Sequence, residues 1–151
     1  MGMPTRVIRV EIAAHAHATE DVERVEQAVL NIVPEGLRGR VKLETRTVEG
    51  HYNNPITRIV ARIEGRDAEE FVRGLARRLD EQSRRILAMM LENRYDQRQG
   101  KFYLRFSKQD AFLGELRLHD GDDVVHVVIT LRGSPSPEKA LKALEELGLK
   151  A

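Results

Sequence analysis

The sequence predicts an α+β fold, in which one mainly antiparallel sheet carries its helices on one face and leaves the other open to solvent. Three observations support this prediction. Six segments rich in β-branched residues alternate between apolar and polar side chains, other segments have helical spacing, and short turns join neighbouring strands. The expected order is β-α-β-β-α-β-β-β-α. Because 151 residues fit one domain, we expect residues 1–151 to form a single α+β domain.

The first half of the chain is expected to contain three strands and one helix. Residues 6–16 alternate with a period of two, which predicts a half-buried strand. We expect Thr19 to cap the next helix, since Glu20 and Asp21 then fall in its first turn, where the helix dipole favours anions. Pro34 ends this helix. Two strands follow, at 41–49 and 56–64.

The second half repeats the two kinds of element. Asp67 is expected to cap a helix that carries Phe71 and Leu75, with a bend near Asp80 before helical spacing resumes. The turn "HDGDD" joins the last two strands, and Ser136 caps a closing helix. The expected strands are 101–107, 115–119 and 124–132, and the closing helix is 137–147.

Composition argues against several classes of site. The chain has no cysteine, which excludes disulfides, thiolate metal sites and a cysteine nucleophile. It shows no glycine loop for phosphates and no serine nucleophile motif. His15 and His17 have a spacing that metal sites use, but a third ligand is not evident and exposed strand histidines are commoner. We expect no catalytic residue, no metal and no cofactor. With no long apolar run and no signal segment, we expect a cytoplasmic protein that does not bind membranes.

Charge is sorted between the two sides of the predicted sheet. The net charge of the chain is +1, whereas the expected solvent face carries eight cations and four anions. Tyr103 and several histidines (His15, His17, His119 and His126) lie near these charges. Such a face can hold phosphates and stack bases, or its Arg and Glu residues can be solubilising cross-strand pairs. The cations are Arg9, Lys42, Arg46, Arg58, Arg62, Arg105, Arg117 and Arg132, and the anions are Glu11, Glu44, Glu64 and Glu115.

Two short stretches carry the remaining candidate contacts. In "GHYNNPI" the glycine, the asparagines and the proline suit a turn, but His51 and Tyr52 do not need to be there. These two side chains either pack onto the core or stack on a base. In "FYLRFSKQ" the phenylalanines and the leucine are expected to face inward, leaving Tyr103 and Arg105 outside. Lys108 and Gln109 are expected on a loop just past the strand, where they either contact RNA or form a solvated strand end.

Three stretches together resemble an archaeal family of RNA-binding proteins and predicted exosome subunits. They are "HATEDVERVEQAVLNIVPE" (17–35), "EGHYNNPI" (49–56) and "FYLRFSKQDAFLGEL" (102–116). The resemblance implies a fold like that of the large-subunit ribosomal protein that binds 5S ribosomal RNA, RNA as the partner, and no catalytic activity. Asn53 and Ser107 depart from the family pattern, where Gly and Asp are usual. We expect the helix at 137–147 to lie outside the shared region.

These observations predict a non-catalytic RNA-binding protein, an accessory of RNA processing or degradation with exosome or ribosome-related proteins as partners. The alternative is an assembly module whose basic sheet face binds an acidic protein. Edge strands and the Met89–Met90 stripe also predict a homodimer. The predicted RNA contacts are Arg46, His51, Tyr52, Asn53, Asn54, Arg58, Arg62, Tyr103, Arg105, Lys108 and Gln109.

Overall fold

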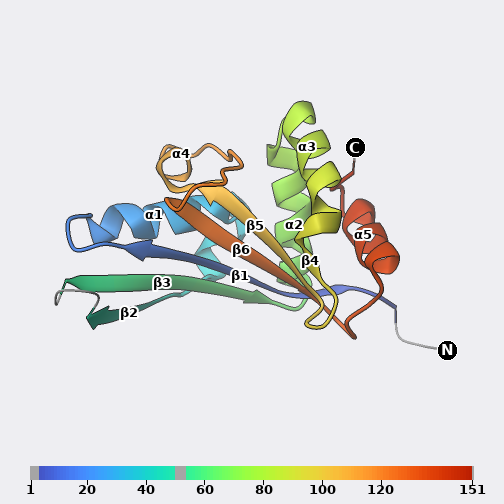
Figure 1. Cartoon of the computed structure of the whole chain (residues 1–151), viewed down its shortest axis with the longest axis horizontal. Coiled ribbons are helices and arrows are strands. Elements are labelled where there is room, and N and C mark those ends of the chain that lie inside the picture. The colour runs from blue at the N-terminus through green and yellow to red at the C-terminus, as the bar shows by residue number, and fades with distance from the viewer. Residues whose placement is uncertain (1–3, 50–53, 151) are drawn as a thin grey trace. The chain divides into compact units, whose positions relative to one another are not determined.

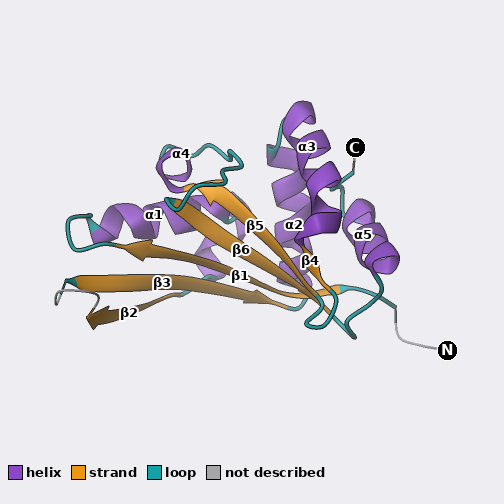
Figure 2. Cartoon of the chain, viewed as in Figure 1, coloured by secondary structure: helices purple, strands orange, loops and turns teal. Residues whose placement is uncertain are grey.

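A computed structural model describes residues 4–49 and 54–150 of the chain (Figures 1 and 2). It confirms an α+β fold with one six-stranded sheet. No helix in these ranges is long and apolar enough to cross a membrane. The elements are β1 (Val7–Ala16), α1 (Val22–Ile32), η1 (Glu35–Arg40), β2 (Leu43–Glu49), β3 (Pro55–Glu64), α2 (Arg66–Arg78), α3 (Glu81–Leu91), η3 (Glu92–Arg94), β4 (Tyr95–Asp96), β5 (Lys101–Ser107), α4 (Lys108–Phe112), β6 (Val124–Leu131) and α5 (Pro137–Glu146).

The strands follow the order β2-β3-β1-β6-β5-β4 and are antiparallel, as predicted. The backbone N–H of Gly65, directly after β3, donates to the carbonyl of Ile8 in β1 at 3.0 Å. The N–H of Arg132, directly after β6, donates to the carbonyl of Arg6 at 3.0 Å. In both pairs the end of one strand meets the beginning of its neighbour, which defines the antiparallel arrangement.

The chain divides into two compact units. The first unit contains Met1–Val10, Ile63–Leu104 and Val128–Ala151, and the second contains Glu11–Arg62 and Arg105–Val127. Strands β1, β3, β5 and β6 each contribute residues to both units. The single-domain organisation expected for residues 1–151 stays a prediction.

Each unit has its own buried side chains. Phe71 and Leu75 of α2, both fully buried, belong to the first unit, together with Phe102 of β5. Ile12 of β1 and Ile32 of α1 are fully buried in the second unit. Burial of each such side chain stabilises the fold by about 1.5–3 kcal/mol relative to exposure. The apolar side chains of the strands and helices therefore form two cores, one in each unit.

Two of the predicted helix caps are wrong. The N-cap of α1 is Asp21, whose carboxylate accepts from the backbone N–H of Glu23 at 3.0 Å. Thr19 lies in the turn before it. The N-cap of α2 is Gly65, at φ 67 and ψ −138, because the chain enters this helix through a backbone conformation that side chains with a Cβ rarely adopt. Asp67 therefore falls inside the first turn of α2.

The segment between β5 and β6 also differs from expectation. The predicted strand at 115–119 is wrong: within the described residues it forms one isolated bridge, Phe106 with Leu118. Residues after β5 form the short helix α4, whose N-cap Ser107 accepts from the N–H of Asp110 at 3.2 Å. The loop expected for Lys108 and Gln109 is therefore a helix.

Three other boundaries follow the sequence closely. Asp80 caps α3, so the expected bend is a break between two helices, α2 and α3. Ser136 caps α5 and Pro137 occupies the first turn, as predicted. The two-residue strand β4 has no recognisable pattern because it is too short to show a period.

Candidate nucleic-acid interface

One face of the sheet in the second unit is open to solvent. Along β3, Ile59 and Ala61 are fully buried whereas Arg58 and Arg62, at the alternate positions, are exposed. In β1, the exposed His15 alternates with fully buried alanines in the same way. The period-two pattern of the sequence therefore places apolar side chains in the core and charged ones on this open face.

Part of the open face neutralises its own charge. The Arg62 Nη1 atom lies 2.6 Å from Glu44 Oε2, and its Nε atom lies 3.2 Å from Glu11 Oε2. The hydrogen bond to Glu44 is the main cause that raises the pKa of the Arg62 guanidinium, and the Glu11 charge adds to it. We call Glu11, Glu44 and Arg62 the paired patch. It matches the cross-strand pairing that the sequence left open as the structural explanation for the charges.

Beside the paired patch, neighbouring strands present positively charged or protonatable side chains. Strands β2, β3, β1, β6 and β5 are consecutive in the sheet, and each supplies one such residue. Arg46 and Arg58 are directly opposite each other in the β2–β3 register. We call this set the cationic row: Arg46, Arg58, His15, His126 and Arg105.

The side chains of the row are close enough for their charges to affect one another. Although the His15 side chain reaches solvent, its partial burial lowers its pKa, and the Arg58 charge lowers it further. Burial also lowers the pKa of His126, followed by the charges of Arg105, His15 and Arg58. Each histidine is therefore influenced by cations on the neighbouring strands. At neutral pH both imidazoles are held in the uncharged form.

Two carboxylates reach the ends of the cationic row. Glu11 Oε1, which belongs to the paired patch, lies 3.3 Å from Arg58 Nη2. Asp120 Oδ1 lies 4.0 Å from Arg105 Nη2. Among residues 4–49 and 54–150, Arg46 has no ion-pair partner. Like charges directly opposite each other destabilise a sheet, and in the Arg46–Arg58 pair only Arg58 has a carboxylate partner among the described residues.

The structure brings four of the sequence-predicted contacts together. Arg46, Arg58, Arg62 and Arg105 all lie in the second unit. Tyr103 is exposed, as expected, but belongs to the first unit. Asn54 is exposed at the start of β3, and Gln109 lies on α4. The predictions for His51, Tyr52 and Asn53 lie outside the described residues.

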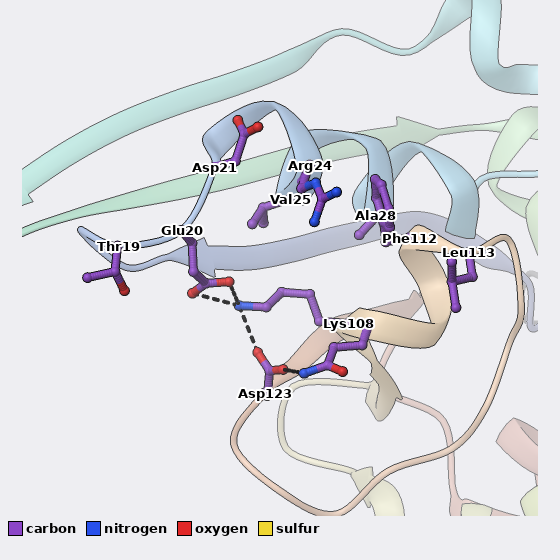
Figure 3. A pocket seen from close by; sticks show the side chains of 11 residues that line it. Thr19, Glu20, Asp21, Arg24, Val25, Ala28, Lys108, Phe112, Leu113 and Asp123 are labelled. Atoms are coloured by element: carbon purple, nitrogen blue, oxygen red, sulfur yellow. Dashed lines mark hydrogen bonds and ion pairs between the residues drawn. The ribbon is translucent and has the colours of Figure 1, made fainter.

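Lys108 does not face solvent, which corrects the prediction. Its ammonium donates to the backbone carbonyl of His15 at 2.9 Å and lies 2.8 Å from Glu20 Oε2 and 2.9 Å from Asp123 Oδ1. Figure 3 shows the ammonium between the two carboxylates. Burial opposes the charged form of Lys108, but the hydrogen bonds to Glu20 and Asp123 outweigh it and raise its pKa. All three N–H donors have partners, so Lys108 holds the fold together.

The alternation of the sequence before Lys108 indicates that this lysine is buried. Phe102, Leu104, Phe106 and Lys108 continue one period-two phase, and the first three are core residues. A lysine in the inward phase predicts a buried ammonium with partners. The acidic partners could not be identified in advance, since Glu20 and Asp123 come from turns far away in the sequence.

A pocket of about 900 Å³ lies beside Lys108, between α1 and α4 (Figure 3). Its floor includes Val25 and Phe112, and the guanidinium of Arg24 stacks over the Phe112 ring at 4.9 Å from the ring centre. Glu20 and Asp123 also line it, and both are paired with the Lys108 ammonium. Within the described ranges, no three His, Asp or Glu side chains come together as a metal site. The Lys108 ammonium of this pocket is already paired within the protein, so the open face with its arginines is the better candidate interface for RNA.

Comparisons with known proteins show what the chain is similar to. A family model described as RNA binding matches residues 9–131. RNA-binding protein PAB1135 of Pyrococcus abyssi is 36% identical over 140 residues, which cover 91% of this chain and 90% of that protein. Protein AF2318 of Archaeoglobus fulgidus has a crystal structure similar to this one, with a TM-score of 0.76, 29% identity, and coverage of 94% of this chain and 99% of the other.

A second solved structure supports the same grouping. Mth689 of Methanothermobacter thermautotrophicus has a TM-score of 0.73 and 26% identity, and the match covers 93% of this chain and 97% of the other. Both solved proteins are described as DUF54 proteins. The family match extends over most of the chain and the Pyrococcus relative is similar along nearly its whole length. The chain therefore belongs to this RNA-binding protein family.

Proposed function

We propose that the protein binds RNA through the open face of its second unit, with Arg46, Arg58 and Arg105 as the main phosphate contacts. The observation that carries this proposal is the cationic row, in which three arginines and two histidines come from five neighbouring strands. Arg46 and Arg58 are directly opposite each other, and like charges in such a pair oppose folding unless a ligand neutralises them. RNA supplies the matching negative charge, and the guanidinium group forms two-pronged contacts with phosphate.

Arg62 and the polar ends of the face have a smaller part in this proposal. Arg62 is held by two carboxylates, so a phosphate has to displace them before it binds. Asn54 and Gln109 remain proposed base contacts at the margins, and Gln109 already donates to Asp123 at 3.3 Å. Tyr103, His51, Tyr52 and Asn53 remain proposed stacking or base contacts.

The proposed role is binding without catalysis. The family and its Pyrococcus relative are named for RNA binding. We propose that the protein works in the cytoplasm as an accessory of RNA processing or degradation, with exosome or ribosome-related proteins as partners. We also propose that the fold is like that of the large-subunit ribosomal protein that binds 5S ribosomal RNA.

Self-association is a further part of the proposal. Strand β2 is at one edge of the sheet and is exposed from Glu44 to Glu49. On α3, the side chain of Met89 is 78% exposed. An edge strand and an exposed apolar side chain are both surfaces at which a second copy can pair. Sedimentation of the purified protein at high micromolar concentration tests for the homodimer, and a clean monomer would contradict it.

A salt titration of RNA binding tests the main proposal. Fluorescence anisotropy with a labelled single-stranded RNA gives the dissociation constant as a function of salt concentration. Contacts between arginine and phosphate release counterions, so affinity falls steeply with salt, with about 0.7 units of logarithmic slope for each phosphate neutralised. Arg58→Ala and Arg105→Ala should each weaken binding to all sequences and reduce the slope by about this amount.

Two variants on helices, and not on the sheet, are controls. Arg77→Ala removes an arginine of α2 that pairs with Glu70 at 2.9 Å, and Glu23→Ala removes an acid of α1. Both should leave affinity and slope unchanged. If Arg77→Ala mattered as much as Arg58→Ala, the proposed face would be wrong. If no RNA bound at low salt, an acidic protein partner for the same basic face would replace this proposal.

A further inference from the structure

We propose that the cationic row is a track for consecutive RNA phosphates, and that His15 and His126 at its centre take up protons when the RNA backbone occupies it. This inference rests on the proposed RNA binding and adds the path of the backbone and its regulation by pH. The ligand class is a run of phosphodiesters lying across the strands. The geometry carries the inference, since the row has one member on each of five neighbouring strands.

The row has the right dimensions for such a ligand. Neighbouring strands are about 4.8 Å apart, so five positions extend over about 19 Å. A nucleic-acid strand presents several phosphates over this length. Arg46 and Arg58 occupy one end, where their positions are directly opposite in the β2–β3 register. Arg105 on β5 occupies the other end, and the two histidines lie on the strands between them.

The two histidines allow the charge at the centre of the row to change with protonation. His15 faces Arg58 on β3, His126 on β6, Lys108 on α4 and, past the end of its own strand, His17. His126 faces Arg105 on β5 as well as Arg58 and His15. The groups whose charges lower the two pKa values are therefore all cationic or protonatable. The carboxylates around the row are Glu11, which Arg58 shares with Arg62, Asp120 beside Arg105, and the pair Glu20 and Asp123, which hold the Lys108 ammonium next to the His15 carbonyl.

A bound phosphate reverses the balance of charge around both imidazoles. In the free protein, burial and the neighbouring arginines lower the pKa of each histidine. A phosphate between them favours the imidazolium and raises each pKa in the complex. A group whose pKa is higher in the complex makes the complex bind more protons, so RNA affinity rises as the pH falls. The gain is about tenfold for each unit by which binding raises one histidine's pKa.

The test measures RNA affinity against pH at constant salt. A labelled oligouridylate of about 12 nucleotides is suitable, because uracil has no group that titrates between about pH 5 and pH 8. We expect the wild-type protein to bind at least about tenfold more tightly at pH 5.5 than at pH 7.5. The double variant His15→Gln, His126→Gln should lose most of this dependence, so that its affinities at pH 5.5 and pH 7.5 differ by less than about threefold.

His17→Gln is the matched control, since His17 lies past the end of β1, 3.9 Å from the carboxylate of Glu20. This variant should keep the pH dependence. If the double variant does not fold, a second measurement on the wild-type protein replaces it. NMR gives the pKa of both imidazoles with and without the oligouridylate. Both values should rise on binding.

Different results separate this inference from the function on which it rests. A wild-type affinity that does not change with pH, a pH dependence that persists in the double variant, or imidazole pKa values that do not rise would overturn the inference. In each of these cases, the proposed RNA binding through the open face would still stand if Arg58→Ala reduced the salt slope. Absence of any binding at pH 5.5 and low salt would overturn both.

Discussion

The paired patch and the cationic row occupy the same open sheet face and use the same residue types in opposite ways. In the patch, Arg62 lies between Glu44 and Glu11 and its charge is compensated within the protein. In the row, Arg46 is opposite Arg58, and the next two strands bring histidines whose pKa values are lowered by burial and then by the arginines. Cross-strand pairs of opposite charge stabilise a sheet and pairs of like charge destabilise it. The difference indicates that the patch contributes to the stability of the fold and the row to ligand binding.

The largest effect is expected when the row is converted into a second paired patch. Arg46→Glu places a carboxylate directly opposite Arg58, which should raise the free energy of unfolding by up to about 1 kcal/mol. RNA affinity should fall by more than about tenfold, because one phosphate contact is lost and a like-charge repulsion is added. Urea unfolding and anisotropy titration measure the two quantities. A variant that was destabilised and still bound RNA normally would remove the distinction between row and patch.

A change at Lys108 distinguishes a residue that stabilises the fold from one that contacts RNA. Lys108→Met leaves the carboxylates of Glu20 and Asp123 without their shared ammonium and should lower the free energy of unfolding by about 1–3 kcal/mol. For a chain of this size each kcal/mol corresponds to about 2–4 °C in melting temperature. The salt slope of RNA binding should stay at the wild-type value because Lys108 has no free donor for a phosphate. A reduced slope with an unchanged melting temperature would show instead that Lys108 contacts RNA.

The stability of the free protein should depend on pH through the row. Both histidines have a lower pKa in the folded protein than in the unfolded chain, so protonation favours the unfolded chain. Their contribution to stability is complete above about pH 6.5 and is lost as the pH falls below it. Urea midpoints at pH 7.5 and pH 5.5 should therefore differ less in His15→Gln, His126→Gln than in the wild type. An equal loss in both proteins would mean that other groups cause it.

The smallest effect is expected from weakening the paired patch. Glu44→Gln removes the carboxylate 2.6 Å from Arg62 and makes this arginine more available to phosphate. RNA affinity should rise by about two- to threefold at low salt, since one partial phosphate contact is added. Glu81→Gln is the matched control, because Glu81 also pairs with an arginine, Arg85 at 2.7 Å, but belongs to helix α3 and not to the sheet. An effect of the same size at Glu81 would indicate general repulsion between RNA and acidic side chains.

The periodic parts of this molecule were predictable from the sequence, and the parts that depend on distant contacts were not. Alternation in 6–16 and 56–64 predicted β1, β3 and the open face that carries Arg58 and Arg62. The helix caps at Asp21 and Gly65 were missed because neighbouring Thr19 and Asp67 have equally good capping chemistry. Sequence alone cannot choose between such neighbours, because tertiary contacts fix where the strand before them ends.

The candidate site shows the same division. The charged residues of the face were identified from their phase, but which of them form ion pairs depends on the register between strands, which the sequence does not specify. The register is what places Arg46 opposite Arg58 and lets Glu44 reach Arg62. Lys108 was placed outside because the strand was expected to end in a loop, whereas Ser107 caps a helix there.

The most direct measurement compares Arg46→Ala with Arg62→Ala in salt titrations of RNA binding. The two arginines lie on neighbouring strands of the same face and differ in whether carboxylates already hold them. The account predicts that Arg46→Ala lowers the logarithmic salt slope by about 0.7 and that Arg62→Ala changes it by less than half as much. Equal reductions in the two variants, or a larger one for Arg62→Ala, would contradict the claim that the unneutralised row binds the RNA backbone.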